Sequence, residues 1–189
     1  LFAFLSQRIN SGESMVGTLE SFGKILPPIG KQELWAAGVT YKRSKVARME
    51  ESEQSGAARF YDLVYEAERP ELFFKSAGWR VQGPGGNLKI RRDSTWNVPE
   101  PELTLLISSA GTIEAYTAGN DMSSRSIEGE NPLYLPQAKI FDGCAALGPC
   151  LLVLNQSIPD STEISMKIFR SGKQEFSGTA VVSQMKRKL

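Results

Sequence analysis

Histidine is absent from this sequence of 189 residues, and cysteine occurs only twice. Without imidazole ligands, the zinc and copper sites that depend on histidine are excluded. Cys144 and Cys150 stand in an apolar segment and lack the CxxC spacing of metal or redox sites. We therefore expect two reduced, packed thiols in place of a disulfide.

The chain also lacks a long apolar run and an excess of either charge. Leu1–Leu5 is a short apolar opening, and no stretch reaches the ~18 residues of a transmembrane helix. Lys and Arg total 22 against 21 Asp and Glu, without a long block of one sign. The composition thus predicts a cytoplasmic protein with a small-molecule partner, and argues against nucleic-acid or membrane partners.

The order of predicted elements indicates an α+β, β-rich fold. Residues 1–31 are interpreted as an N-terminal arm or the remnant of a small N-terminal domain, since prolines and glycine interrupt them near the end. Residues 32–189 form the main domain. Helices are expected over 41–53 and 57–67, and strands over 34–39, 71–75, 88–92, 150–154 and 164–170.

A β-hairpin is the most informative local prediction. An extended run from Val98 to Ile107 carries Glu100 and Glu102 two residues apart, so both side chains share one face. A turn at Ala110–Gly111 would place Glu100 opposite Asp121 and Glu102 opposite Gly119. Three carboxylates then gather within reach of one another.

Three gathered carboxylates repel one another unless a cation or raised pKa values neutralise them. With oxygen ligands only, Mg²⁺ is the expected ion, and Mn²⁺ or Ca²⁺ would also fit. The alternative interpretation is that Glu100 and Glu102 are solvated charges on an edge strand, where prolines and charges discourage aggregation.

These motifs together resemble the fumarylacetoacetate hydrolase family. The resemblance comprises the ExE pair, Gly119-Asn120-Asp121, and Lys139-Ile140-Phe141-Asp142 followed by Leu147-Gly148-Pro149. It implies a mixed β-sandwich roll in which Glu100, Glu102 and Asp121 hold Mg²⁺ and Lys139 lies beside the substrate. It also implies that 32–189 is a catalytic domain, incomplete at its C-terminal end, in a protein that forms homodimers or homotetramers.

Many hydrolases of this family use a histidine shortly after a G-x-x-Y element as the general base. Here Gly38-Val39-Thr40-Tyr41 is present, but Ser44 occupies the matching position. The segments around residues 69–75 and 123–139 resemble the branch that dehydrates 2-keto-3-deoxy sugar acids such as 2-keto-3-deoxy-arabinonate. In that branch, residues matching Glu71 and Lys139 stand at the substrate as an acid and base pair. Without the resemblance, Glu71 reads as a surface charge.

The resemblance therefore implies a metal-dependent hydro-lyase acting on a 2-oxo acid. Arg125, Ser123, Tyr134 and Ser44 are candidate substrate-binding residues, although Arg125 would equally suit a structural salt bridge. One alternative is a hydrolase or decarboxylase acting on acylpyruvates or oxaloacetate. Another is a noncatalytic β-domain stabilised by Ca²⁺.

Overall fold

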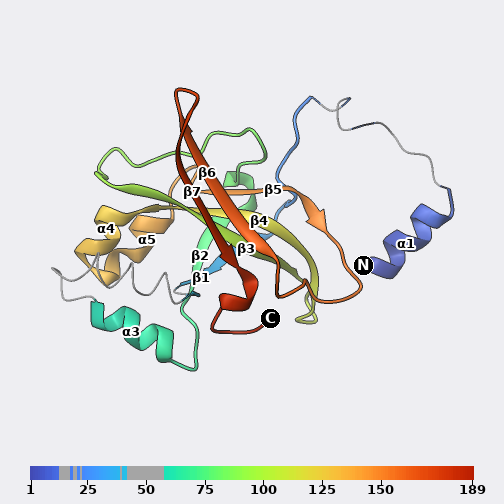
Figure 1. The fold of residues 1–189 in the computed structure, drawn as a ribbon, viewed down its shortest axis with the longest axis horizontal. Coiled ribbons are helices and arrows are strands. Elements are labelled where there is room, and N and C mark those ends of the chain that lie inside the picture. Colours follow the sequence, from blue (N-terminus) through green and yellow to red (C-terminus); the bar gives the residue numbers. More distant parts are fainter. Residues whose placement is uncertain (13–17, 19–20, 22, 39, 42–57) are drawn as a thin grey trace.

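A computed structural model of the chain describes residues 1–12, 18, 21, 23–38, 40–41 and 58–189. The predicted helix over 41–53 falls outside the described residues apart from Tyr41, and so does Ser44. Within the described part, strands predominate over helices (Figure 1), which confirms the predicted α+β, β-rich class.

The strands form three small antiparallel sheets. β1 pairs with β2, β4 lies between β3 and β5, and β6 pairs with β7. The strands are β1 (Glu33–Ala37), β2 (Leu72–Ala77), β3 (Asn97–Ile107), β4 (Ile113–Ser124), β5 (Ala145–Leu152), β6 (Glu163–Arg170) and β7 (Lys173–Val181). The helices are α1 (Phe2–Asn10), α3 (Ala58–Glu66), α4 (Arg125–Glu130) and α5 (Leu135–Lys139), with 3₁₀ turns η2 (Gly78–Arg80), η3 (Pro132–Tyr134) and η4 (Val182–Gln184).

The β3–β4 hairpin has the predicted register. Glu100 pairs with Asp121, and Glu102 pairs with Gly119. Gly111 adopts a positive φ of 78° in the connecting turn, a conformation that glycine accepts without steric cost. The Ser108 backbone closes the turn, since its N–H donates to the Thr112 carbonyl at 2.9 Å. The turn at Gly111 and this hydrogen bond determine which side chains face each other across the hairpin.

Two short helices follow β4 directly and return the chain to the same sheet. Ser124 caps α4, because its hydroxyl oxygen accepts a hydrogen bond from the Ile127 N–H. Pro136 lies in the first turn of α5, where its missing N–H does no harm. Figure 1 shows α4 and α5 side by side at one end of the sheet. The last residue of α5 is Lys139, which is thereby buried next to β4.

A compact core joins β5 to the segment before β3. Val81, Cys144, Ala145 and Leu147 are buried together, and Phe141 packs against them. The Gln82 N–H donates to the Ala145 carbonyl, and Gln82 accepts from Leu147 N–H, which extends the sheet by an isolated bridge. Cys144 is buried as predicted, whereas Cys150 is exposed; both thiols are free.

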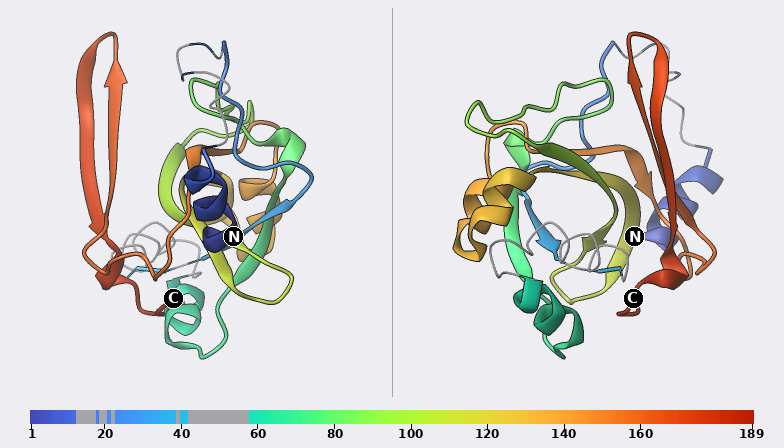
Figure 2. Two further views of the ribbon diagram at one scale, coloured as in Figure 1. Left: turned by 90° about the vertical axis from the view of Figure 1, so that its right-hand side faces the viewer. Right: turned by 60° about the vertical axis from the view of Figure 1, so that its left-hand side comes forward.

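The β6–β7 hairpin projects beside the rest of the fold. Figure 2 shows it standing apart from the curved β3–β4 ribbon. Phe169 and Phe176 on this hairpin are exposed. None of the helices in the described part of the chain combines the length and apolar character needed to cross a membrane.

One local prediction is wrong. Residues 88–92 form irregular backbone and a turn where a strand was expected; Lys89 N–H donates to the Gly143 carbonyl, while the Arg91 side chain binds Asp93. The N-terminal arm contains helix α1, which ends at Asn10, well before the interrupting prolines.

Candidate metal and 2-oxo acid site

The three predicted carboxylates converge on one face of the β3–β4 hairpin. One oxygen from each of Glu100, Glu102 and Asp121 lies within 4.8 Å of the others. Asp121 is buried, and the two glutamates are half-buried. Such a set of oxygen atoms, partly withdrawn from water, suits a hard divalent cation.

Gly119 keeps the sheet tight beside this cluster. It pairs with Glu102, and a Cβ built on it would overlap the Thr104 hydroxyl and also touch Leu147. The absence of a side chain at this position allows β3 and β4 to approach closely where the carboxylates meet.

Lys139 reaches the cluster from α5. Its side chain is almost fully buried, and its Nζ donates to Glu100 Oε2 at 2.9 Å, Asp121 Oδ2 at 3.0 Å and Ser123 Oγ at 2.6 Å. The sequence-predicted Lys139 and Ser123 are thus brought together with two of the three acids. The predicted edge-strand alternative for Glu100 is disfavoured, because its carboxylate is paired within the fold.

Lys75 on β2 is a second buried lysine that the sequence analysis missed. Its Nζ lies 2.5 Å from Asp121 Oδ1, 2.9 Å from the Met122 carbonyl and 2.5 Å from the Lys139 carbonyl. All three ammonium protons therefore have an acceptor. The available signal was a lysine placed inside a strand with aromatic residues, where a surface side chain is not expected.

Arg125 at the start of α4 holds the outer side of the cluster. Its Nη2 lies 2.5 Å from Glu100 Oε1, and its Nη1 lies 3.3 Å from Glu128 Oε2. Glu100 is thus paired with both Arg125 and Lys139. Of the two interpretations offered for Arg125, the structural salt bridge is present, and this arrangement also leaves a guanidinium beside the metal ligands.

Glu102 differs electrostatically from its two neighbours. Among the described residues, it forms no ion pair, while Glu100 and Asp121 both bind cations. Burial, followed by the negative charges of Asp121 and Glu100, raises the pKa of Glu102 to about 8. A divalent ion among these carboxylates would favour its deprotonated form.

Glu71 immediately precedes β2. Alternation along the strand gives Glu71, Phe73 and Lys75 a common face, and the Phe73 ring centre lies 5.6 Å from Lys139 Nζ. The Glu71 carboxylate is half-buried against Gly38, where any Cβ would overlap it. Glu71 is therefore partly withdrawn from solvent against Gly38 and is not a fully solvated surface charge.

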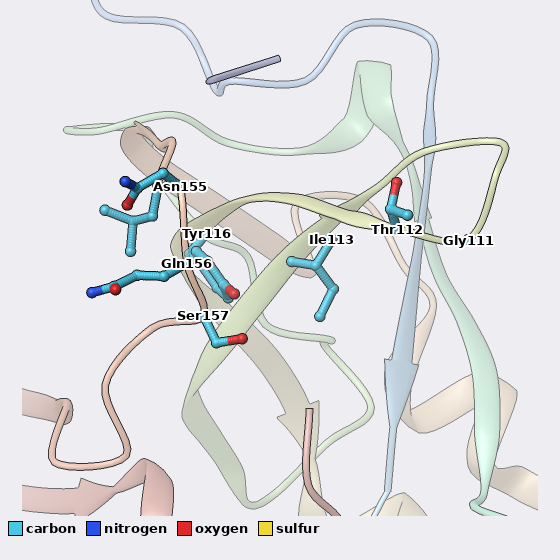
Figure 3. Close-up of a pocket in the computed structure, with 8 residues that line it drawn as sticks. Gly111, Thr112, Ile113, Tyr116, Asn155, Gln156 and Ser157 are labelled. Carbon is cyan, nitrogen blue, oxygen red and sulfur yellow. The ribbon is translucent and has the colours of Figure 1, made fainter. Parts of the chain in front are cut away.

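Tyr134 lies in η3 and is partly exposed at 39%. No direct contact between Tyr134 and the carboxylates is found in the described part of the chain. A separate surface pocket of about 380 Å³ lies between the β3–β4 turn and the segment after β5 (Figure 3). Its lining contains neither carboxylate nor lysine, so its chemistry differs from that of the cluster.

The fumarylacetoacetate hydrolase C-terminal family profile matches residues 35–188, which include every residue of this cluster. The chain belongs to the fumarylacetoacetate hydrolase family. The predicted resemblance is confirmed, and the mixed β-sandwich roll of the family agrees with the strand-rich fold. The ExE pair, the Gly119-Asn120-Asp121 turn and Lys139, on which the resemblance was based, are the residues that the fold gathers at one site.

Two curated members of this family are similar over most of the chain. A probable 2-keto-3-deoxyxylonate dehydratase of Haloferax volcanii is 48% identical over 161 residues, covering 85% of this chain and 54% of the relative. The 2-dehydro-3-deoxy-D-arabinonate dehydratase of Saccharolobus solfataricus is 40% identical over 168 residues, covering 88% of this chain and 56% of the relative. The chain therefore spans about half the length of both.

A solved family structure shows the same fold with ligands. The structure of 2-keto-3-deoxy-D-arabinonate dehydratase complexed with magnesium and 2,5-dioxopentanoate aligns with a TM-score of 0.74 and 35% identity. The alignment covers 97% of this chain and 67% of that chain.

Proposed function

We propose that the protein catalyses the metal-dependent dehydration of a 2-keto-3-deoxy sugar acid of the 2-keto-3-deoxy-arabinonate type. The observation that carries this proposal is the meeting of three carboxylates with buried Lys139 in a chain that contains no histidine. Support comes from the two curated dehydratases and from the relative bound to magnesium and a 2-oxo acid.

Glu100, Glu102 and Asp121 fit a magnesium ion by their donor chemistry. All three offer oxygen, their atoms lie within 4.8 Å of one another, and burial together with the charges of Asp121 and Glu100 raises the pKa of Glu102. A bound divalent cation supplies Lewis acidity, which makes a proton at C3 of a 2-oxo acid easier to remove. The same oxygen set would accept Mn²⁺ or Ca²⁺.

Lys139 and Glu71 are proposed to share the two proton transfers. Dehydration breaks a C3–H bond and the C4–O bond; one residue takes the C3 proton, the other donates a proton to the departing hydroxyl, and water leaves. Lys139 Nζ donates hydrogen bonds to two of the candidate metal-binding carboxylates, and Glu71 immediately precedes β2. Because the reaction needs both proton transfers, both residues are expected to be required for turnover.

Substrate binding is proposed for Arg125, Ser123, Tyr134 and Ser44. Arg125 suits a substrate carboxylate because guanidinium groups bind carboxylates in a planar, bidentate manner. Ser123 is fully buried and touches Lys139, so it can fix the lysine or a substrate oxygen. Tyr134 is accessible at the edge formed by η3, and Ser44 is assigned through the resemblance alone.

The proposal is tested by incubating the purified protein with 2-keto-3-deoxy-arabinonate or 2-keto-3-deoxy-xylonate and Mg²⁺. Formation of the dehydrated 2-oxo acid, followed by mass spectrometry, is the expected result, and a metal chelator should abolish it. Acylpyruvates and oxaloacetate are the comparison substrates. Turnover of these, without dehydration of the sugar acids, would replace the proposal with hydrolase or decarboxylase activity.

A further inference from the structure

Gly38 is the first residue of the G-x-x-Y element and lies opposite Glu71. Ala37 pairs with Leu72 at the end of the β1–β2 ladder, and the Gly38 N–H then donates to the Glu71 carbonyl at 3.1 Å. The register therefore continues for one more residue and makes Gly38 and Glu71 a cross-strand pair. Side chains of directly opposed residues project from the same face of a sheet.

The Glu71 carboxylate occupies the space that a side chain at position 38 would fill. A Cβ added to Gly38 would overlap Glu71 Oε2 and would lie 2.8 Å from the carboxyl carbon of Glu71. The three heavy atoms nearest to this Cβ all belong to the Glu71 side chain, and none belongs to the backbone. Glycine is thus the residue that leaves this space to the carboxylate.

The row of side chains that begins with Glu71 leads to the carboxylate cluster. Phe73 and Lys75 follow on the same face of β2. The Phe73 ring centre lies 5.6 Å from Lys139 Nζ, and Lys75 Nζ lies 2.5 Å from Asp121 Oδ1. A glutamate side chain can adopt several staggered rotamers, so its place in the row does not by itself fix its carboxylate. The space left open at Gly38 selects one of them.

We propose that Gly38 is a positioning residue, which holds the Glu71 carboxylate where the dehydration requires it. This inference rests on the proposed function, in which Glu71 shares the proton transfers with Lys139. A side chain at position 38 would drive the carboxylate to another rotamer. The atoms displaced are the end of a flexible side chain, so the change affects catalysis far more than the stability of the fold.

The Gly38→Ala variant tests this role. The φ of Gly38 is not positive, so alanine fits its backbone without strain. We expect kcat for the sugar acid to fall by about ten- to hundredfold, since displacement of a reacting group by about 1 Å can cost this much. KM should change by less than about threefold. Mg²⁺ affinity, measured by calorimetry, should stay within about twofold, and the melting temperature within about 3 °C.

Gly30→Ala is the matched control. The φ of Gly30 is not positive either, and a Cβ there would meet only Gln32 Oε1, at an ordinary contact distance of 3.4 Å. This variant should keep the original kcat, Mg²⁺ affinity and melting temperature.

A double-mutant cycle shows whether Gly38 acts through Glu71. Once Glu71→Ala has removed the carboxylate, adding Gly38→Ala should lower kcat no further. Any loss of melting temperature in Gly38→Ala should likewise be recovered in the double variant, because the overlapping atoms are gone.

Three results would overturn the inference. An unchanged kcat in Gly38→Ala, with the original protein active, would remove the positioning role and leave the proposed function intact. A further fall of kcat in the double variant, or a stability loss that Glu71→Ala does not recover, would show that Gly38 acts through the backbone. If the original protein dehydrates no sugar acid, the proposed function itself fails, and this inference fails with it.

Discussion

Lys75 and Lys139 occupy the same acidic cluster but are bound in different ways. Lys139 donates to Glu100 Oε2 and Asp121 Oδ2, from the carboxylates that would ligate a cation. Lys75 binds the other Asp121 oxygen and two backbone carbonyls. A cation would therefore compete mainly with Lys139, whereas Lys75 can keep its hydrogen bonds. Lys139 can therefore give up its carboxylate contacts to a cation, whereas Lys75 keeps its contacts.

Lys139 should be required for turnover and not for metal binding. In Lys139→Ala, dehydration should fall by about hundredfold or more, because a general acid or base is lost. Mg²⁺ affinity should be equal or higher, since Glu100 and Asp121 lose a competing cation. Initial rates and calorimetry provide the two readouts.

Lys173→Ala is the control for this prediction, because the Lys173 side chain is 78% exposed on β7. It should change neither quantity. Parallel losses of Mg²⁺ affinity and rate in Lys139→Ala would instead show that Lys139 only holds the carboxylates in place.

Lys75 should contribute mainly to the stability of the fold. In Lys75→Met, Asp121 Oδ1 loses its ammonium partner in a buried setting, and two carbonyls lose their donor. Removing one member of a buried pair typically costs about 3–5 kcal/mol. Urea unfolding in the presence of a chelator measures this loss. A decrease below about 1 kcal/mol, typical of surface ion pairs, would contradict the buried role.

At the scale of elements, the β3–β4 register at the carboxylates could be predicted because its signals are local, although the register shifts between Leu106 and Ile107. Prolines around Glu100, the turn at Gly111 and the alternation of side chains all agree on one register. Lys75 could not be assigned to the site in this way. Its approach to Asp121 depends on how β2 packs beside β4, and a local sequence pattern does not predict such a contact.

The short helices and β7 were beyond sequence reasoning for a different reason. α4 and α5 span 6 and 5 residues, which is too short for a 3.6-residue apolar period to emerge. β7 is mostly exposed, so its residues show little alternation between apolar and polar types. Lys139 was therefore identified through a family motif, but the sequence did not predict that it lies on a helix.

The close approach of β3 and β4 at Gly119 yields a prediction for the hairpin. In Gly119→Ala, the new methyl group would overlap the Thr104 hydroxyl, so the strands must shift beside Glu102. We expect a stability loss of about 1–3 kcal/mol and weaker Mg²⁺ binding. The double variant Gly119→Ala with Thr104→Ala removes the overlapping hydroxyl and should recover part of both losses. An unaltered single variant in thermal unfolding and calorimetry would disprove the tight approach.

At the scale of the whole molecule, ion pairs join segments that are distant in sequence. The cluster ties β2 to β3, β4 and α5, and near the C-terminus Lys186 Nζ binds Glu66 Oε2 at 2.9 Å while Arg187 donates to the Ala67 carbonyl at 2.6 Å. These C-terminal contacts link α3 to the segment that pairs with Tyr41. The chain spans about half of its curated relatives, and the described residues nevertheless assemble all three metal-binding candidates.

The raised pKa of Glu102 predicts how global stability depends on pH. Its pKa is about 8 in the fold against an ordinary 4.5, so the folded chain binds this proton more tightly than the unfolded chain does. The stability contributed by this proton is full below 4.5 and is lost as the pH rises through 8. With a chelator present, the melting temperature should therefore decline from about pH 6 to pH 9.

Magnesium should reverse this decline, because binding requires the deprotonated carboxylate and releases its proton. The rise in melting temperature on adding Mg²⁺ should be larger at high pH than at low pH. In Glu102→Gln, both the pH slope attributed to this group and the magnesium effect should be lost. A melting temperature that does not vary with pH in the original protein would refute the shifted titration.

The internal neutralisation of the cluster has a consequence for how the protein matures. Glu100 and Asp121 are balanced by the protein's own cations, and Glu102 keeps its own proton near neutral pH. Unlike a zinc finger, whose ligands collapse only around their metal, this chain can complete its assembly first and recruit an ion afterwards. The ion would then be needed for the proposed activity but not for folding of the chain.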